Sequence, residues 1–184
     1  MTDQPAAPFR VLFVCTGNIC RSAYADVVAR HLALPGVEFS SAGTYALAGQ
    51  GMDAPMAAEA AARGIDASHT ARQLTRPLVE GADLVVAMAA EHRRFILDDW
   101  PALGRRAFII GHVSRELGRL PEGIGLDGLA GYLWQYRTSE DGDDVPDPYR
   151  RGPEAFEASF ELIKTAVDVI VEAAWGPGTW RKQP

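Results

Sequence analysis

The chain has 184 residues, 47% of them hydrophobic, which predicts one globular domain with its own core. Its formal net charge of −6 disfavours a general nucleic-acid-binding surface, and we found no apolar run long enough for membrane insertion. Two cysteines are too few for a disulfide scaffold, and the first eight residues do not resemble a secretory signal. We therefore expect a reducing, cytoplasmic setting.

Strand and helix signals alternate along the chain. Runs rich in β-branched, aromatic and other apolar residues predict strands at 9–14, 37–41, 82–88 and 107–110, and helical patterns predict helices at 22–34, 55–63, 91–97 and 153–174. This alternation favours an α/β fold with a parallel sheet. We expect a flexible N-terminus at 1–8, a single folded domain at 9–175 and a tail at 176–184.

The segment 114–144 interrupts this alternation. It contains several glycines, and Leu129, Leu133 and Trp134 predict one short helix within a long loop. The segment leads directly towards Asp147. We therefore hypothesise that it is a mobile flap that contacts a protein substrate and takes no part in the chemistry.

Both cysteines lie in VCTGNICRS, residues 14–22, directly after the first predicted strand. In a doubly wound fold, such a loop lies beyond the carboxyl end of a strand, where backbone amides and a helix N-terminus bind anions. The Cys-x5-Arg spacing lets the loop curl around one tetrahedral oxyanion, with the Arg21 fork on two of its oxygens. The same groups favour a thiolate at Cys15, so the loop is predicted to be both nucleophile and phosphate cradle.

This loop resembles the active-site loop of the low-molecular-weight protein tyrosine phosphatases. The stretches SSAGT, SHTARQL, ADLVVAM and PDPYR match further in the same order, over most of residues 9–171. The resemblance implies an α/β, flavodoxin-like doubly wound sheet of about four parallel strands with helices on both faces. GHV and VPDPYRRGPEAF are most similar to the bacterial branch that partners tyrosine kinases of capsule and exopolysaccharide export.

The resemblance also implies a role for each matched residue. Cys15 would form a cysteinyl-phosphate, Arg21 would clamp the phosphoryl oxygens, and Asp147 would protonate the leaving phenolate and then activate water. The substrate-binding residues would be Thr16, Gly17, Asn18, Ile19, Cys20, Ser22 and Tyr149. Ser22 would hydrogen-bond the sulfur, and Ser41 and His69 would support the loop. No cofactor or metal is implied, because amides and Arg21 neutralise the charge.

Two of these roles have simpler alternatives. Other acids precede Asp147, but only Asp147 stands between two prolines, which restrict its backbone. Tyr149 could be a packing residue or a wall of an aromatic slot, and we favour the slot. Tyr45 is a second candidate wall. Cys20 could be a small packing residue, but we expect a redox role in which it traps oxidised Cys15 as a disulfide, as the resemblance implies.

The expected activity is hydrolysis of phosphotyrosine in a tyrosine-phosphorylated protein, for example a bacterial tyrosine kinase. Protein arginine phosphatases have a similar loop, with threonine where this chain has Ile19. A thiol-dependent arsenate reductase on the same scaffold would need cysteines beyond Cys15 and Cys20. A non-catalytic phosphotyrosine-binding module would not need Asp147.

Overall fold

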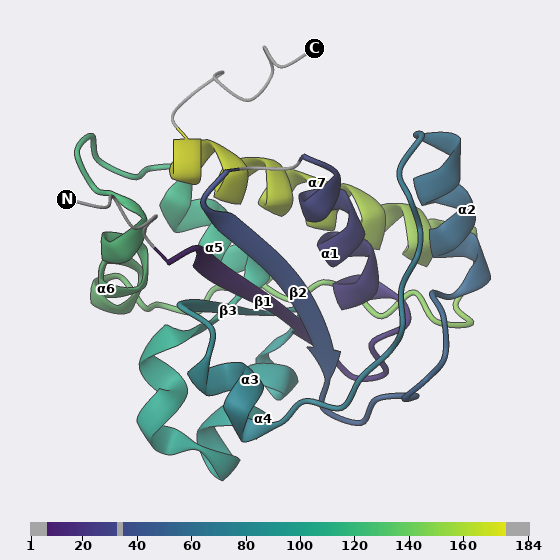
Figure 1. Ribbon diagram of the computed structural model, residues 1–184, viewed down its shortest axis with the longest axis horizontal. Helices are drawn as coiled ribbons and strands as arrows, with labels where there is room; N and C mark the ends of the chain where they lie inside the picture. The colour runs from purple at the N-terminus through teal and green to yellow at the C-terminus, as the bar shows by residue number, and fades with distance from the viewer. Residues whose placement is uncertain (1–6, 33–34, 176–184) are drawn as a thin grey trace, which may run out of the picture.

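A four-stranded parallel sheet forms the centre of the computed structural model, which describes residues 7–32 and 35–175 (Figure 1). Its strands are β1 (Phe9–Cys15), β2 (Val37–Gly43), β3 (Leu84–Ala87) and β4 (Ala107–Ile109), and their order is β2-β1-β3-β4. All neighbouring strands pair in parallel. From β1 the chain first adds β2 on one side and then β3 and β4 on the other, which confirms the predicted doubly wound sheet. The switch point of such a sheet lies beyond the carboxyl ends of β1 and β3.

Helices cover both faces of this sheet. The first face carries α1 (Arg21–His31), α5 (Ile110–Leu117) and α7 (Pro153–Trp175), and the second carries α3 (Arg76–Glu80), α4 (Ala90–Asp99) and the 3₁₀ helix η1 (Pro101–Arg106) (Figure 1). Val11 and Phe13 of β1 pack towards the first face, and Leu12 and Val14 towards the second. Both clusters are almost fully buried, as expected of a strand enclosed on both sides.

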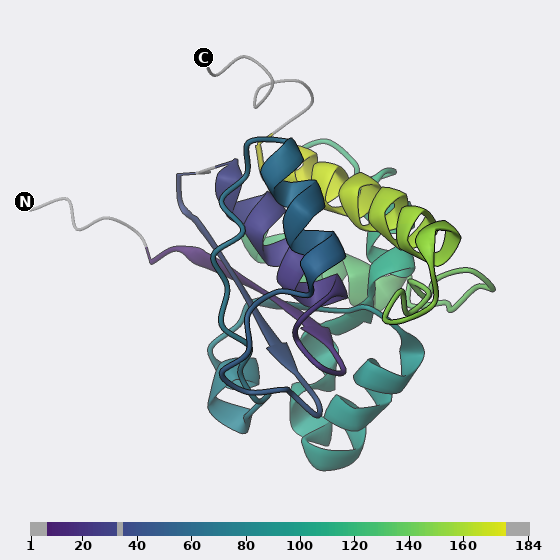
Figure 2. The same cartoon turned by 90° about the vertical axis from the view of Figure 1, so that its right-hand side faces the viewer.

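Helix α2 (Ala54–Ala62) packs beside α1 on the first face, with α7 running nearby (Figure 2). At the end of α2, the Arg63 guanidinium lies 4.2 Å from the ring centroid of Phe160 on α7. This contact fixes the end of α2 against the long C-terminal helix.

The sequence did not predict two of the α-helices, α3 and α5. Helix α3 has only five residues, too few to show a helical period. Helix α5 follows β4 without an intervening loop, and Ile110, assigned to the strand by sequence, is its first residue. The segment that begins at Ser114 is therefore not a loop from its start, because residues 114–117 form the second half of α5.

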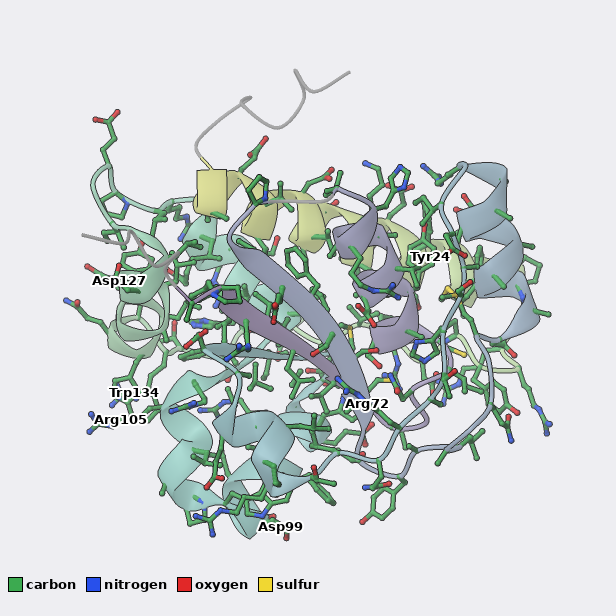
Figure 3. The ribbon with its side chains drawn as sticks, in the orientation of Figure 1. Tyr24, Arg72, Asp99, Arg105, Asp127 and Trp134 are labelled. Carbon is green, nitrogen blue, oxygen red and sulfur yellow. The ribbon has the colours of Figure 1, made fainter. Side chains whose placement is uncertain are left out.

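The rest of this segment contacts the domain mainly through its short helix. It contains the 3₁₀ turn η2 (Leu126–Gly128) and α6 (Leu129–Gln135), and this helix confirms the predicted short helix. Leu129 and Leu133 are fully buried. Trp134 lies beside Arg105 of η1, 5.4 Å from its guanidinium, far from the arrowhead of β2 (Figure 3). Leu129, Leu133 and Trp134 thus anchor α6, while residues 135–142 are exposed, and a role of the segment in contacting a protein substrate stays a prediction.

Some predictions concern the chain ends. The predicted flexible N-terminus falls mostly on residues 1–6, and the predicted tail on residues 176–184, and both lie outside the described residues. Among the helices formed by residues 7–32 and 35–175, none is long and apolar enough to cross a membrane.

Candidate active site

The loop from Cys15 to Arg21 connects β1 to α1 at the carboxyl end of the sheet. The carbonyl groups of residues 15–19 accept hydrogen bonds from other segments of the chain. Those of residues 15, 16, 17 and 19 accept N–H groups of Thr44, Tyr45, Leu47 and Asp53 at 2.8–3.0 Å. Because N–H and C=O point in opposite directions in a trans peptide, outward carbonyls turn the loop amides inward. The inner side of the loop is therefore a cradle of N–H donors for an anion.

The Cys15 sulfur lies at the base of this cradle. It is 2.8 Å from the Ser22 hydroxyl in the first turn of α1. Asn18 Nδ2 donates to the same hydroxyl at 3.0 Å, and the Ser22 hydrogen has two acceptors in reach, the sulfur at 2.8 Å and the more distant Ala42 carbonyl at 3.5 Å. A hydroxyl that donates to sulfur stabilises a thiolate and a thiolate leaving group.

Asn18 holds the bend of the loop. Its φ of +55° lies in the left-handed region, which asparagine tolerates better than most residues. Nδ2 of Asn18 also donates to Ser41 at 3.0 Å, and its carbonyl lies 2.6 Å from His69 Nε2. Its side-chain oxygen accepts the Arg72 amide at 2.9 Å. Ser41 and His69 thus both contact Asn18 of the loop.

Gly43 lets the end of β2 approach the loop closely. A Cβ built at this position would lie 2.4 Å from the Thr16 carbonyl oxygen and 3.0 Å from the Asn18 amide nitrogen. Real Cβ atoms do not come so near to backbone, so any side chain would displace the cradle. The glycine of the SSAGT stretch is therefore a geometric requirement of the site.

Arg21 is buried, with 3% of its surface exposed, yet its guanidinium is incompletely paired. Nη1 donates to the Val145 carbonyl at 3.2 Å, and Nη2 lies 3.3 Å from Asp147 Oδ2. Nε has no hydrogen-bond partner among the described residues. A buried guanidinium with a free N–H beside a cradle of amides is suited to a tetrahedral oxyanion.

Asp147 stands at the mouth of the cradle on a restrained backbone. Its Oδ1 accepts the Tyr149 amide at 3.2 Å, and the carbonyl of the preceding Pro146 accepts the Ser159 hydroxyl of α7 at 2.6 Å. The Asp147 side chain is 41% exposed, so it reaches both solvent and the cradle. It is placed to exchange a proton with a group bound above the sulfur.

A cavity of about 210 Å³ opens over the cradle. It is lined by Cys15, Thr16, Gly17, Ile19, Cys20, Arg21, Tyr45, Leu47, Asp147 and Tyr149. Ile19, Leu47 and the two tyrosines give it apolar and aromatic walls above a polar floor. Tyr45 is 71% exposed and packs edge-on against Phe95, with ring centroids 5.7 Å apart. The shape suits a flat ring that carries an anionic group at one end.

Cys20 also lines this cavity, and its thiol is free in the structure, like that of Cys15. Burial, and then the negative charge of Asp53, raise the pKa of the Cys20 thiol far above its usual value. Cys20 is therefore protonated at neutral pH.

Sequence reasoning missed two polar residues of the site. His92, buried in the first turn of α4, places Nε2 2.9 Å from the Thr16 hydroxyl. Burial, and then the nearby charge of Arg21, lower the pKa of His92 to about 4, so its ring is neutral at pH 7. Its position just after β3, beside the switch point, could have indicated it.

The second missed residue is Asp26 of α1, which is 6% exposed. Its carboxylate accepts the Ser41 hydroxyl at 3.0 Å and forms an ion pair with Arg30 at 2.8 Å. Asp26 lies four residues after Ser22 on the same face of α1, and this spacing is the signal that could have revealed it. It extends the chain of hydrogen bonds that begins at the Cys15 sulfur.

The fold and the site define a class of protein in which a cysteine nucleophile stands inside an anion-binding loop. The model of the low molecular weight phosphotyrosine protein phosphatase family matches residues 10–114. A probable low molecular weight protein-tyrosine-phosphatase, EpsP, of Ralstonia nicotianae is 36% identical over 169 residues, which cover 91% of this chain and 93% of that protein. The chain belongs to this family, as its sequence predicted, and is a hydrolase.

Comparison with solved structures supports the same family assignment. The YwlE arginine phosphatase of Geobacillus stearothermophilus has a TM-score of 0.70 and 30% identity, covering 90% of this chain and 92% of that one. The tyrosine phosphatase Wzb of Escherichia coli K30, in complex with sulphate, has a TM-score of 0.67 and 26% identity, with 89% and 96% covered. An arginine phosphatase and a tyrosine phosphatase therefore both share this fold.

Proposed function

We propose that this enzyme hydrolyses phosphotyrosine in proteins through a cysteinyl-phosphate intermediate. The observation that carries the proposal is the placement of Asp147 beside the buried Arg21 at the cavity mouth, with the Cys15 sulfur at the base of the loop. In the first step, the Cys15 sulfur attacks phosphorus and Asp147 gives its proton to the departing phenolate oxygen. Arg21 and the loop amides hold the three other oxygens, where negative charge gathers.

The second step releases inorganic phosphate. Asp147, now a carboxylate, takes a proton from a water molecule that attacks the phosphorus, and the sulfur leaves as a thiolate. The Ser22 hydroxyl, 2.8 Å from the sulfur, stabilises that leaving group. Tyr149 and Tyr45 flank the ring of the substrate.

The apolar lining favours phosphotyrosine over phosphoarginine. The side chain of Ile19 reaches the cavity with carbon atoms only, and Leu47 stands beside it. A phosphorylated guanidinium carries several N–H groups that would lose water there without gaining acceptors. A tyrosine ring loses nothing by the same contact.

We propose that the natural substrate is a tyrosine-phosphorylated bacterial protein of the cytoplasm, such as a tyrosine kinase. This follows from the resemblance to the capsule and exopolysaccharide branch and from the relationship to EpsP.

Steady-state assays on a phosphotyrosine peptide, the matching phosphoarginine peptide and arsenate, under one set of conditions, test the proposal. We expect kcat/KM for phosphotyrosine to exceed that for phosphoarginine by at least about 100-fold, and no thiol-dependent arsenate reduction. A preference for phosphoarginine would overturn it.

A further inference from the structure

The segment 143–147, which carries Asp147, is held in place by backbone contacts with neighbouring elements. The carbonyl of Asp143 accepts the Gly111 amide of α5 at 3.0 Å, and the Val145 amide donates to Met88, just past β3, at 2.8 Å. The position of Asp147 therefore depends on how the chain is docked four residues earlier.

Gly111 makes this docking unusually close. A Cβ at Gly111 would lie 2.4 Å from the Cα of Asp143 and 2.7 Å from its carbonyl oxygen. Both atoms belong to backbone, so neither can move aside as a flexible side chain would. The backbones of α5 and of segment 143–147 touch directly, and Gly111 is the residue that permits it.

Arg115 lies one turn further along α5, on the same side of the helix. Its guanidinium pairs with the carboxylate of Asp143, which is only 5% exposed, and lies 3.2 Å from that of Glu140. It also donates to the carbonyl of Thr138 at 2.9 Å. One side chain of α5 thus neutralises a buried carboxylate and gathers residues 138–143 against the helix.

The Asp143 carboxylate has a second task, because its Oδ2 accepts the Glu140 amide at 2.9 Å and closes the turn before the segment. Without Arg115, this carboxylate would be buried unpaired, close to the carboxylates of Glu140 and Glu116. Breaking a buried pair from one side is strongly destabilising. The strain is relieved if Asp143 moves off α5 towards water.

We propose that Gly111 and Arg115 form a docking platform on α5 that sets the position of Asp147, with Arg115 as a positioning residue for proton transfer. The inference rests on the proposed role of Asp147 as the acid. Neither platform residue lines the cavity over the Cys15 sulfur, so the platform acts through the backbone of segment 143–147.

Hydrolysis of two esters that differ in leaving group tests the platform. For Arg115→Met we expect kcat/KM to fall about 10- to 100-fold for phenyl phosphate, whose phenolate needs a proton, and less than about 3-fold for p-nitrophenyl phosphate. Inhibition by inorganic phosphate should stay unchanged. Gly111→Ala should give the same pattern. Arg119→Met is the matched control, because Arg119 is an arginine just beyond α5 and it is Arg115 that pairs with the carboxylates of Asp143, Glu140 and Glu116.

A compensating variant separates positioning from general loss of structure. The double variant Arg115→Met/Asp143→Asn removes both buried charges, and we expect it to recover part of the phenyl phosphate activity lost in Arg115→Met. If Arg115→Met does not fold, Arg115→Lys, which keeps the charge but not the fork, replaces it, with an intermediate loss expected. Equal losses on both esters in a folded variant would overturn the platform.

Hydrogen exchange of the Val145 amide gives a readout that does not depend on activity. We expect its protection to fall in Arg115→Met and to persist in Arg119→Met, while amides of β1 stay protected in both. Unchanged protection in Arg115→Met would overturn the platform even if the wild type proved inactive on aryl phosphates. That inactivity would instead count against the proposed function.

Discussion

The carboxylate of Asp147 lies 3.3 Å from the guanidinium of Arg21, so the proposed proton donor and the proposed phosphate clamp meet at the cavity mouth. Arg21 also binds the Val145 carbonyl, two residues before Asp147. The buried Arg21 side chain therefore contacts both the segment that carries the proposed proton donor and the place where the phosphoryl oxygens would bind. A phosphate ester that binds Arg21 brings its leaving oxygen towards Asp147.

Replacing Asp147 should lower kcat/KM most for esters whose leaving group needs a proton. We expect Asp147→Asn to lower kcat/KM for phenyl phosphate by about 10²–10⁴-fold, because the amide cannot donate an acidic proton to the phenolate. The loss should shrink for p-nitrophenyl phosphate. The control is Asp141→Asn, at an exposed acid of the same region. Equal losses across leaving groups would show that Asp147 is not the acid. Asp144 is a poor replacement, since its carboxylate accepts the Ala90 amide at 2.8 Å.

Adding one carbon at Gly43 should damage the cradle. The new Cβ of Gly43→Ala would press on the Thr16 carbonyl, and overpacking of this kind costs about 1–3 kcal/mol. If the loop absorbs the strain, phosphate affinity should weaken roughly 5- to 150-fold, measured as competitive inhibition. Gly131→Ala in α6, where a Cβ meets no atom within 4 Å, is the control. Unchanged phosphate affinity in Gly43→Ala would refute the requirement for glycine.

His92 should make the fold sensitive to acid. Its pKa is lowered from 6.5 to about 4 by burial and then by Arg21, so between these values the unfolded chain binds a proton that the folded chain does not. Stability therefore falls as pH falls through this window, by about 2 kcal/mol at pH 4.5. Urea unfolding at pH 4.5 and 7.5 should show a smaller loss for His92→Gln, with exposed His31→Gln as control. Equal pH dependence in wild type and His92→Gln would argue against this assignment.

Cys20 should make the oxidation of Cys15 reversible by forming a disulfide with it. Peroxide would convert the Cys15 thiolate to a sulfenic acid and release hydroxide. The Cys20 thiolate would then attack that sulfur and displace a second hydroxide, which gives the Cys15–Cys20 disulfide. Because attack needs the thiolate and the pKa of Cys20 is raised by burial and then Asp53, the trapping should be faster at pH 8.5 than at pH 6.5.

Recovery of activity after peroxide and then dithiothreitol measures this trapping. The wild type should recover most of its activity, and Cys20→Ala should keep its basal activity but recover little. Full recovery of Cys20→Ala would leave Cys20 with only a packing role.

The sequence predicted those parts of the fold and site that are local. Cys15, Arg21 and Ser22 lie within eight residues, so their spacing alone placed them in one loop. The parallel sheet followed from buried apolar runs such as that of β3. Ser41 and His69 came from the family resemblance, because no local pattern links them to Asn18.

Features that arise between distant segments escaped the prediction. His92 meets Thr16 across 76 residues, and its burial depends on how α4 packs against the sheet. The close contact of Gly111 with Asp143 likewise exists only in the folded chain. Trp134 is partly buried because α6 packs on η1, an element too short to predict, whereas Tyr136 is exposed.

Rapid-quench mass spectrometry of the wild type during turnover of a phosphotyrosine peptide tests the central claim most directly. The account predicts one phosphoryl group on the peptide that contains Cys15, formed before inorganic phosphate appears and lost at the rate of turnover. Cys15→Ser should lose turnover by more than about 10³-fold yet still bind phosphate, because the amides and Arg21 remain. Turnover with no phosphoryl group on Cys15, or with the group on another residue, would contradict the account.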